Sequence, residues 1–472
     1  MKSGYLGVPC CIIEGVSAAT AQIPEPLVER RLPPGPSGLR FYFSLLRIPK
    51  NWLRFLGRLA KNYGDISFFH LLNVPICFIN RPEYIESVLV SGVSDFLKSK
   101  DYAPLKTLMG NGLLTSEGEF WRRQRKLVQP AFHRERIAAY GDVMVEYAEK
   151  TIAGWRDAET RDVHKDMMKL TLDIVAKTLF DADVTSDAVE VGEALEVGME
   201  RYSALAWFAV FLPPSVMTPW NWIFHRTLRR LDAIIYRVIR ARRESKNDPG
   251  DLLSILLQAQ AEDGSRMTDQ QLRDEVMTLF LAGHETTANA LAWTWYLLSL
   301  NPLAEARLHA ELKEVLGGRS PRFEDLQRLR YTQMVVKESL RLFPPAWGIG
   351  RETLKEIRVG DYRLPPGTNV FISQWVMHRN PRYFDLPEEF HPERWTEEFE
   401  KQLPKFAYFP FGGGPRVCVG ASFASMETAL LLATIAQRYR LALVPGHPVK
   451  PLASVTLRPK HGIRVKLQKR PA

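Results

Sequence analysis

The feature that most constrains the fold is a long stretch without a helix breaker between Thr268 and Pro302. Thr268 and Gln271 have the spacing of a capping box, which marks the N-terminus of a helix. Such a helix is about 50 Å long, whereas a compact chain of 472 residues is only about 60 Å across. We therefore expect a long central helix that crosses the molecule, with Ala282 and Gly283 leaving room at its centre for something bulky.

Helical spacing of apolar residues dominates the rest of the chain, and strand patterns occur in two regions. Asp65–Asn80 and Glu356–Ser373 combine β-branched and aromatic residues with bounding turn residues, which predicts strands. The expected fold is mainly α with a smaller β-sheet region. We expect a single domain over residues 33–472, preceded by a flexible tail of residues 1–32. Helices are expected at Arg136–Trp155, Arg161–Leu179, His225–Ser245, Asp251–Glu262, Pro302–Leu316, Thr332–Leu342 and Ser422–Tyr439.

Composition narrows the class of protein. Hydrophobic residues make up 46% and charged residues 25%, as in ordinary globular proteins, which argues against a disordered or fibrous chain. The net charge of +10 suits an anionic membrane surface or an acidic protein; nucleic acid is set aside because no nucleic-acid-binding signature is present. Four cysteines without a C-x-x-C pair favour a reducing compartment, the cytoplasm. The apolar run Tyr5–Ile13 is too short for a transmembrane segment.

The strongest chemical signal is the segment Phe411-Gly-Gly-Gly-Pro-Arg-Val-Cys-Val-Gly420. Cys418 precedes an amphipathic helix, whose free N–H groups and positive dipole end favour a thiolate. Gly414 permits a tight loop. The alternative is a buried structural cysteine after a glycine turn. The segment resembles the cysteine-ligand loop of the cytochrome P450 family, F-x-x-G-x-R-x-C-x-G, at every fixed position.

This resemblance implies the cytochrome P450 fold, with Cys418 as the axial ligand to the iron of haem b. It also implies that Phe411 shields the sulfur from water and that Gly414 shapes the loop. Arg416 would pair with a haem propionate, and Gly420 would let the helix approach the porphyrin. The other cofactor-binding positions implied by the resemblance are Trp121, Arg125, Arg351 and Ala282.

A second motif joins Glu338 and Arg341, which are three residues apart on one helix face. Alone, such a pair is usually a surface salt bridge. Here Pro392-Glu-Arg394-Trp395 follows, and the P450 family pairs the helix residues with the arginine of a P-E-R-F segment. Trp395 in place of phenylalanine is interpreted as a change of aromatic packing that leaves the charged triad intact. The implied role of Glu338, Arg341 and Arg394 is structural, fixing the loop of Cys418.

A third motif, Ala282–Thr287, lies inside the long helix and resembles the family's oxygen-activation segment. The resemblance implies two catalytic residues: Thr286, which hydrogen-bonds dioxygen, and Glu285, which helps to relay protons. His284-Glu285 also begins an H-E-x-x-H zinc motif, but Ala288 at the second histidine position excludes it. A core helix in which a threonine bonds its own carbonyls is the remaining alternative.

The resemblance runs from about Pro33 to the C-terminus and implies a stand-alone, bacterial-type haem monooxygenase. Such an enzyme hydroxylates or epoxidises an organic substrate with O2. Electrons come from NAD(P)H indirectly, through a reductase and an acidic ferredoxin or flavodoxin, and no flavin or iron–sulfur domain is expected in this chain. Two alternatives stand beside it: a peroxide-using haem-thiolate enzyme, which would not need Glu285 and Thr286, and a non-enzymatic haem sensor or carrier.

The substrate is expected to be lipophilic, because Ala204–Phe224 contains six aromatic rings and no charge. Pro213, Pro214 and Pro219 are expected to break this segment into a loop. An apolar loop at the surface marks a ligand entrance or a peripheral membrane contact, and ordinary core packing is the alternative. Fatty acids, terpenoids and carotenoids all fit. The candidate substrate-pocket residues are Trp207, Phe208, Phe211, Ala346 and Ile349.

Overall fold

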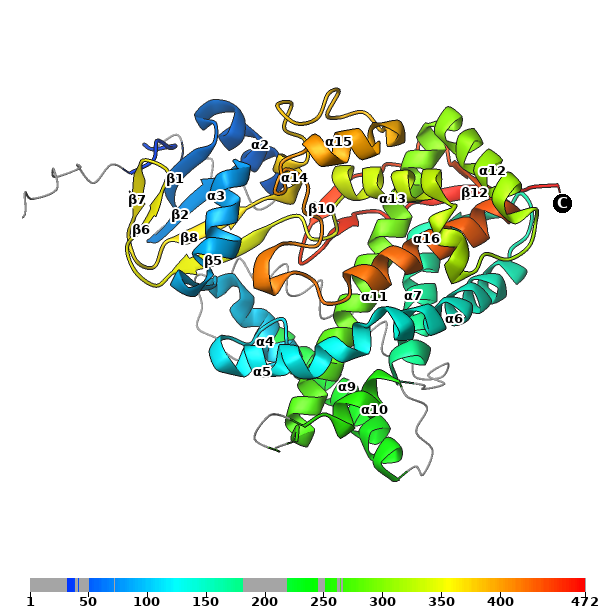
Figure 1. Cartoon of the computed structure of the whole chain (residues 1–472), viewed down its shortest axis with the longest axis horizontal. Helices are drawn as coiled ribbons and strands as arrows, with labels where there is room; N and C mark the ends of the chain where they lie inside the picture. The colour runs from blue at the N-terminus through cyan, green and yellow to red at the C-terminus, as the bar shows by residue number, and fades with distance from the viewer. Residues whose placement is uncertain are drawn as a thin grey trace, which may run out of the picture.

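Helix α11 (Asp269–Leu300) runs through the middle of the computed structural model, with the largest sheet on one side and a layer of helices on the other (Figure 1). Its 32 residues make it about 48 Å long. Thr268 caps it: the Thr268 hydroxyl accepts a hydrogen bond from the Gln271 backbone N–H at 3.2 Å, and the Gln271 side chain accepts one from the Thr268 N–H at 2.9 Å. The predicted helix that crosses the molecule is therefore confirmed.

The structure describes residues 32–38, 41, 51–71, 73–180, 219–244, 251–260, 264 and 266–471. Nearly all of the expected N-terminal tail, and residues 204–218 of the apolar segment, lie outside this part of the chain. Among the helices within it, none is both long enough and apolar enough to cross a membrane.

Three helices bury the main hydrophobic core together with α11. α7 (Val163–Phe180) and α16 (Ala421–Arg438) pack on α11, and α6 (Arg134–Ala153) packs on both of them. Core side chains such as Trp293 and Leu430 are fully buried, and each buried side chain of this size contributes about 1.5–3 kcal/mol. The other helices are α2 (Trp52–Tyr63), α3 (Pro82–Glu86), α4 (Ala103–Met109), α5 (Gly118–Val128), α9 (Pro219–Glu244), α10 (Leu252–Gln258), α12 (Pro302–Leu316), α13 (Arg330–Leu342), α14 (Gln374–Met377) and α15 (Glu397–Gln402).

The largest sheet has five strands in the order β1–β2–β8–β5–β3. β1 (Ile66–Leu71) and β2 (Val74–Ile79) form an antiparallel pair, and β2 runs parallel to β8 (Asn369–Ile372). β5 (Ile349–Thr353) is antiparallel to β8 and to the edge strand β3 (Phe96–Lys98). The sheet thereby joins distant parts of the sequence. The smaller sheets contain β4 (Thr160–Asp162), β6 (Ile357–Val359), β7 (Tyr362–Leu364), β9 (Tyr439–Leu443), β10 (Pro451–Ala453), β11 (Leu457–Pro459) and β12 (Arg464–Lys469).

The predicted elements are confirmed in their main lines, and most helix ends shift by about two residues. Two predictions are wrong. Pro219 does not break the apolar segment; it is the first residue of α9, where a proline costs little because the first N–H groups of a helix have no intrahelical partner. Helix α10 ends at Gln258 rather than Glu262. The strands β3, β4, β5 and β9–β12 were not predicted, because most are short and pair with distant segments.

Candidate active site

The cysteine loop, residues 411–420, is held by its own backbone before α16 begins. The Cys418 N–H donates to the Phe411 carbonyl at 3.0 Å, and the Gly420 N–H hydrogen-bonds to the Cys418 sulfur. Gly414 has a φ of 68°, and a Cβ there would lie 1.9 Å from the Leu89 carbonyl oxygen. Only glycine fits this turn. The loop therefore fixes the thiol at the N-terminus of an 18-residue helix.

Cys418 combines an exposed side chain with the electrostatics of a buried one. Burial by the surrounding protein raises the pKa of the Cys418 thiol, whereas the Gly420 N–H and Arg125 act to lower it. The Cys418 side chain thus has free surface although it is surrounded by protein. Coordination to a metal would deprotonate such a thiol despite its burial.

Helix α11 has free surface at its centre. Ala282 is exposed and Thr286 is half-buried, although Leu281 and Glu285 beside them are buried. The Thr286 hydroxyl donates to the Ala282 carbonyl at 2.5 Å. Gly283 was expected to leave room here together with Ala282, but it does not. A Cβ on Gly283 would lie 3.1 Å from Val175 on α7, so Gly283 serves the packing of two helices.

Positive side chains gather beside the cysteine loop. Arg125 on α5 donates to the Val417 carbonyl at 2.8 Å. The Arg416 guanidinium lies 4.5 Å from the centre of the Trp121 ring and forms an ion pair with Glu117. Trp121 and Arg125, four residues apart on α5, therefore both reach the cysteine loop. Trp121 contacts Arg416, and Arg125 contacts Val417.

Two further cations reach the same region from the sheet. Arg351 on β5 is buried, and Lys98 on β3 is its partner in the strand register. Burial, followed by repulsion from Arg416, lowers the pKa of Lys98 to about 7, and Arg351 adds to this repulsion. Mutually repelling cations of this kind suit an anionic ligand such as a pair of carboxylates. Sequence analysis missed Lys98, which no motif marks.

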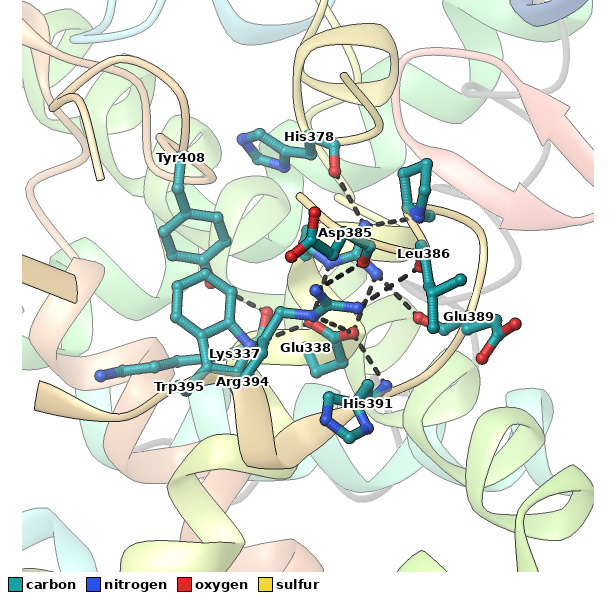
Figure 2. A network of polar contacts seen from close by, with 12 residues as sticks. Lys337, Glu338, His378, Asp385, Leu386, Glu389, His391, Arg394, Trp395 and Tyr408 are labelled. Carbon is teal, nitrogen blue, oxygen red and sulfur yellow. Dashed lines mark hydrogen bonds and ion pairs between the residues drawn. The ribbon is translucent and has the colours of Figure 1, made fainter. Parts of the chain in front are cut away.

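The carboxylate of Glu338 on α13 is the centre of a buried polar network (Figure 2). Arg341 donates to both of its oxygens, from Nε and Nη2, at 2.8 Å each. Arg394 donates from Nε at 3.0 Å, and the His391 N–H donates at 2.9 Å, both to Oε1. The structure thus brings together the three charged residues that were singled out from the sequence.

Trp395 has a part in this network that sequence analysis did not foresee. Its indole N–H donates to Glu338 Oε2 at 3.0 Å, and its side chain is buried. The charged triad is intact, as predicted, but Trp395 does more than change the aromatic packing, because phenylalanine has no such donor. The indole also packs on Tyr408, whose hydroxyl donates to the Lys337 carbonyl at 3.0 Å.

Glu285 has a partner far away in the sequence. The Thr456 hydroxyl, in the turn between β10 and β11, donates to Glu285 Oε1 at 2.7 Å. Both side chains are buried. No sequence motif marks Thr456, and only the packing of the hairpin on α11 reveals it.

The candidate substrate-pocket residues are only partly described. Ile349 is half-buried, and its Cδ1 lies 3.6 Å from where a Cβ on Gly412 would be, so it borders the cysteine loop. Ala346 is exposed. Three of the candidates lie outside the described residues: Trp207, Phe208 and Phe211.

Known proteins match nearly the whole chain. The sequence profile of the family Cytochrome P450 matches residues 33–467. Two relatives come from Streptomyces melanosporofaciens: Cyclooctatin synthase, 41% identical over 89% of this chain and 92% of that protein, and Cyclooctat-9-en-7-ol 5-monooxygenase, 38% identical over 84% and 86%. The solved structure of the cytochrome P450DA heme domain has a TM-score of 0.84 at 26% identity, covering 93% of this chain and 98% of that one.

Proposed function

The chain belongs to the cytochrome P450 family, and from this premise we propose how its residues carry out the reaction. It is an oxygen-incorporating oxidoreductase with a haem cofactor. We propose that it inserts one atom of O2 into a lipophilic substrate, by hydroxylation or epoxidation, with electrons from a separate redox partner. The observation that carries this proposal is the cysteine loop, which holds Cys418, with its side chain exposed, at the N-terminus of α16.

Cys418 is the proposed axial ligand of haem b. The Gly420 N–H and the charge of Arg125 favour its thiolate form. Phe411, which is half-buried, is proposed to shield the sulfur from water, and the exposed Ala282 on α11 is proposed to contact the cofactor. The residues proposed to hold the propionates are Trp121, Arg125, Arg351 and Arg416, with Lys98 as an addition from the structure.

When bound, a thiolate-ligated haem supplies the activation of O2 that allows one oxygen atom to enter the substrate while the other leaves as water. The chain's own contribution at that step is the handling of protons. The Thr286 hydroxyl, at the free surface of α11, would give up its proton from Oγ1, and Glu285 would take up a proton from water and pass it on to replace the one given up. This pair favours a monooxygenase over a peroxide-using enzyme or a haem sensor.

A terpenoid-like substrate is the class that we propose. One relative is named as the 5-monooxygenase of cyclooctat-9-en-7-ol, a hydrophobic alkenol, which favours a terpenoid over a fatty acid. Ile349 beside the cysteine loop and the exposed Ala346 are proposed to line its site. The aromatic residues Trp207, Phe208 and Phe211 are proposed to cover its entrance.

An acidic ferredoxin or flavodoxin, reduced by an NAD(P)H-dependent reductase, is the proposed electron donor. Arg122 and Lys126 on α5 are exposed, as are Lys401 and Lys405 at α15 and just before the cysteine loop. Arg122 pairs with Glu119 and Lys401 pairs with Glu397, each on its own helix, so part of this charge is already neutralised. The remaining positive charge suits an acidic partner.

A cytoplasmic location with peripheral membrane contact is proposed from the charge of α9. This helix carries seven arginines against two acidic residues, Asp232 and Glu244. Such a basic helix, next to an aromatic segment without charge, suits an anionic lipid surface. The exposed arginines of α9 are Arg226, Arg229, Arg230, Arg237, Arg240 and Arg243.

The test of this function begins with the ferrous protein under carbon monoxide. We expect the red-shifted Soret band of a thiolate-ligated haem, and Cys418→His should abolish it. Purified protein with ferredoxin, reductase and NAD(P)H should then convert cyclooctat-9-en-7-ol or a related terpenoid to an oxygenated product. An unchanged band in Cys418→His would refute the ligand assignment, and a thiolate band without any oxygenated product across a terpenoid panel would favour the haem sensor.

A further inference from the structure

Four polar side chains form an unbroken chain of hydrogen bonds that ends on Glu285. His164 Nε2 lies 3.0 Å from Asn289 Oδ1. Asn289 Nδ2 donates to Thr456 Oγ1 at 3.0 Å, and Thr456 Oγ1 donates to Glu285 Oε1 at 2.7 Å. The four residues come from three separate elements: α7, α11 and the β10–β11 hairpin.

The chain runs from a partly accessible end into the core. His164, near the N-terminus of α7, is half-buried. Asn289 is fully buried, and both Thr456 and Glu285 are nearly so. Asn289 lies four residues after Glu285, so the two side chains share one face of α11. In a buried environment each of these hydrogen bonds is stronger than it would be in water.

The hairpin that supplies Thr456 is tied to the rest of the fold on both sides of that residue. The Trp293 indole N–H donates to the Leu457 carbonyl at 2.9 Å, and the Trp347 indole N–H donates to the Ser454 carbonyl at 2.8 Å. Leu457 also donates its backbone N–H to the Pro345 carbonyl at 2.9 Å. The backbone on both sides of Thr456 is therefore held in place independently of the bond to Glu285.

The direction of the donors follows from the Asn289 amide. Its Nδ2 donates to Thr456 Oγ1, so the single hydroxyl proton of Thr456 goes to Glu285 Oε1. The Asn289 carbonyl faces His164, which therefore donates from Nε2. All three donors point toward Glu285 Oε1, which is a stronger acceptor when the carboxylate is ionised.

Donation from Nε2 requires only a proton on that nitrogen, which a neutral imidazole can supply. Burial lowers the pKa of His164, whereas Asp162 and the hydrogen bond to Asn289 oppose that effect. Arg458 on β11 and Lys165 on α7 add a smaller lowering effect. The Asp162 carboxylate also accepts the His164 backbone N–H at 3.1 Å. A neutral imidazole with its proton on Nε2 can complete the chain.

We propose that Thr456, Asn289 and His164 are positioning residues that hold the Glu285 carboxylate in one orientation and in its ionised form. The inference rests on the proposed role of Glu285 in proton supply. The chain is a clamp and not a proton wire, because a neutral amide such as Asn289 does not pass protons on readily. Protonation on Oε1 would break the bond from Thr456, and protonation on Oε2 would weaken it, because a neutral carboxyl oxygen is a poorer acceptor than an ionised one. The clamp therefore favours the ionised carboxylate.

Infrared spectroscopy of the haem-loaded, CO-bound ferrous protein tests this inference without a substrate. Glu285→Gln identifies the carboxyl band of Glu285 and the effect of its charge on the C–O stretch. Thr456→Val keeps the shape of the side chain and removes the hydroxyl, and Thr456→Ser restores the hydroxyl. Thr434→Val is the matched control, because Thr434 is a buried threonine on α16 that bonds the Leu430 carbonyl of its own helix at 2.8 Å.

We expect Thr456→Val to shift the protonation equilibrium of Glu285 toward the neutral acid about tenfold or more, as expected for the loss of a hydrogen bond to a charged group. Thr456→Ser and Thr434→Val should match the wild type. His164→Phe, at the accessible end, should give a smaller shift in the same direction, and it tests the proposal if Thr456→Val does not fold.

The clamp would be overturned if Thr456→Val had normal haem content and wild-type bands. If Thr456→Val does not fold, wild-type bands in His164→Phe would overturn it. Bands in Thr434→Val that shift as much as those in Thr456→Val would also overturn it, since the effect would then come from any lost hydroxyl. Failure of the proposed function gives a different result: a CO band without thiolate character, or product formation in Glu285→Gln equal to that of the wild type.

Discussion

Replacing Trp395 with phenylalanine isolates one hydrogen bond in the Glu338 network. The substitution removes the indole N–H that donates to Glu338 Oε2 at 3.0 Å and keeps an aromatic ring at that position. Glu338 is fully buried, so water cannot readily replace the lost donor. Arg341 and Arg394 remain bonded to the carboxylate. We therefore expect the network to weaken without collapsing.

The magnitude follows from the charge of the acceptor. A hydrogen bond to a charged group contributes about 1.5–3 kcal/mol to stability. An unfolding entropy of about 2.1 cal/mol/K per residue gives about 1 kcal/mol/K for the chain of 472 residues. A loss of about 2 kcal/mol therefore lowers the unfolding midpoint by about 2 °C.

Trp155 provides the control for the smaller ring. It is buried much as Trp395 is, with 6% against 3% of its surface exposed. Its indole N–H has no acceptor among the described residues, so Trp155→Phe removes the same volume without breaking a hydrogen bond. The difference between the two variants therefore contains the hydrogen bond to Glu338 together with the gain from removing an unpartnered donor at Trp155.

The assay is thermal unfolding of the haem-loaded protein, followed by circular dichroism and by the haem absorbance in one scan. A single scan rate is needed because a large protein often unfolds irreversibly. We expect Trp395→Phe to unfold about 2 °C below Trp155→Phe and to release haem at a lower temperature. Equal midpoints would refute the reasoning and leave Trp395 as a packing residue.

The other predictions concern the same site. Glu338→Ala leaves two buried guanidinium groups without their carboxylate, at a cost of about 3–5 kcal/mol, so most of the protein should lack haem; a normal haem-to-protein absorbance ratio would contradict this. Thr286→Ala should load haem and bind substrate but divert NAD(P)H electrons to peroxide, and fully coupled product formation would remove Thr286 from the mechanism. Reduction by an acidic ferredoxin should slow as ionic strength rises and when the charges of Arg122 and Lys126 are reversed; a rate insensitive to both would place docking on another face.

The parts of the fold that the sequence predicts are those with local signals. Helix α11 is predictable because a capping box starts it and no proline interrupts it. The cysteine loop is predictable because its defining residues all lie within ten positions, 411–420. One of them is Gly414, whose positive φ favours glycine. The three charged residues of the Glu338 network can also be anticipated. One motif supplies Glu338 and Arg341, and the other supplies Arg394.

The contacts that the sequence does not predict join distant segments. Thr456 bonds Glu285 across 171 positions, and no spacing rule connects a hairpin turn to the middle of a helix. Lys98 reaches the cations of the cysteine loop only because β3 pairs with β5. Trp395 looks like a substitution of one aromatic residue for another until its N–H is seen on a carboxylate. In each case a polar atom finds its partner through tertiary packing, which a linear pattern does not encode.

The Glu338 network explains how the irregular segment before Cys418 keeps its shape. Between α14 and α16 the described chain contains only short helices, so side chains must satisfy many of its backbone groups. Arg341 does this directly, donating to the carbonyls of His378, Pro387 and Glu389 at 2.9, 2.6 and 2.9 Å.

His378 continues this support toward the cysteine loop. Burial, followed by repulsion from Arg341, lowers the pKa of His378 to about 3, so its ring stays neutral and Nε2 can accept the Phe409 N–H at 3.0 Å. Phe409 lies two residues before the loop that carries Cys418. Glu338 on α13 thus fixes Arg341, and Arg341 fixes the backbone at His378. The His378 ring in turn holds Phe409, just before the cysteine loop. The position of Cys418 therefore depends on buried charge as well as on the apolar core, which is why we expect the loss of Glu338 to be felt first as loss of haem.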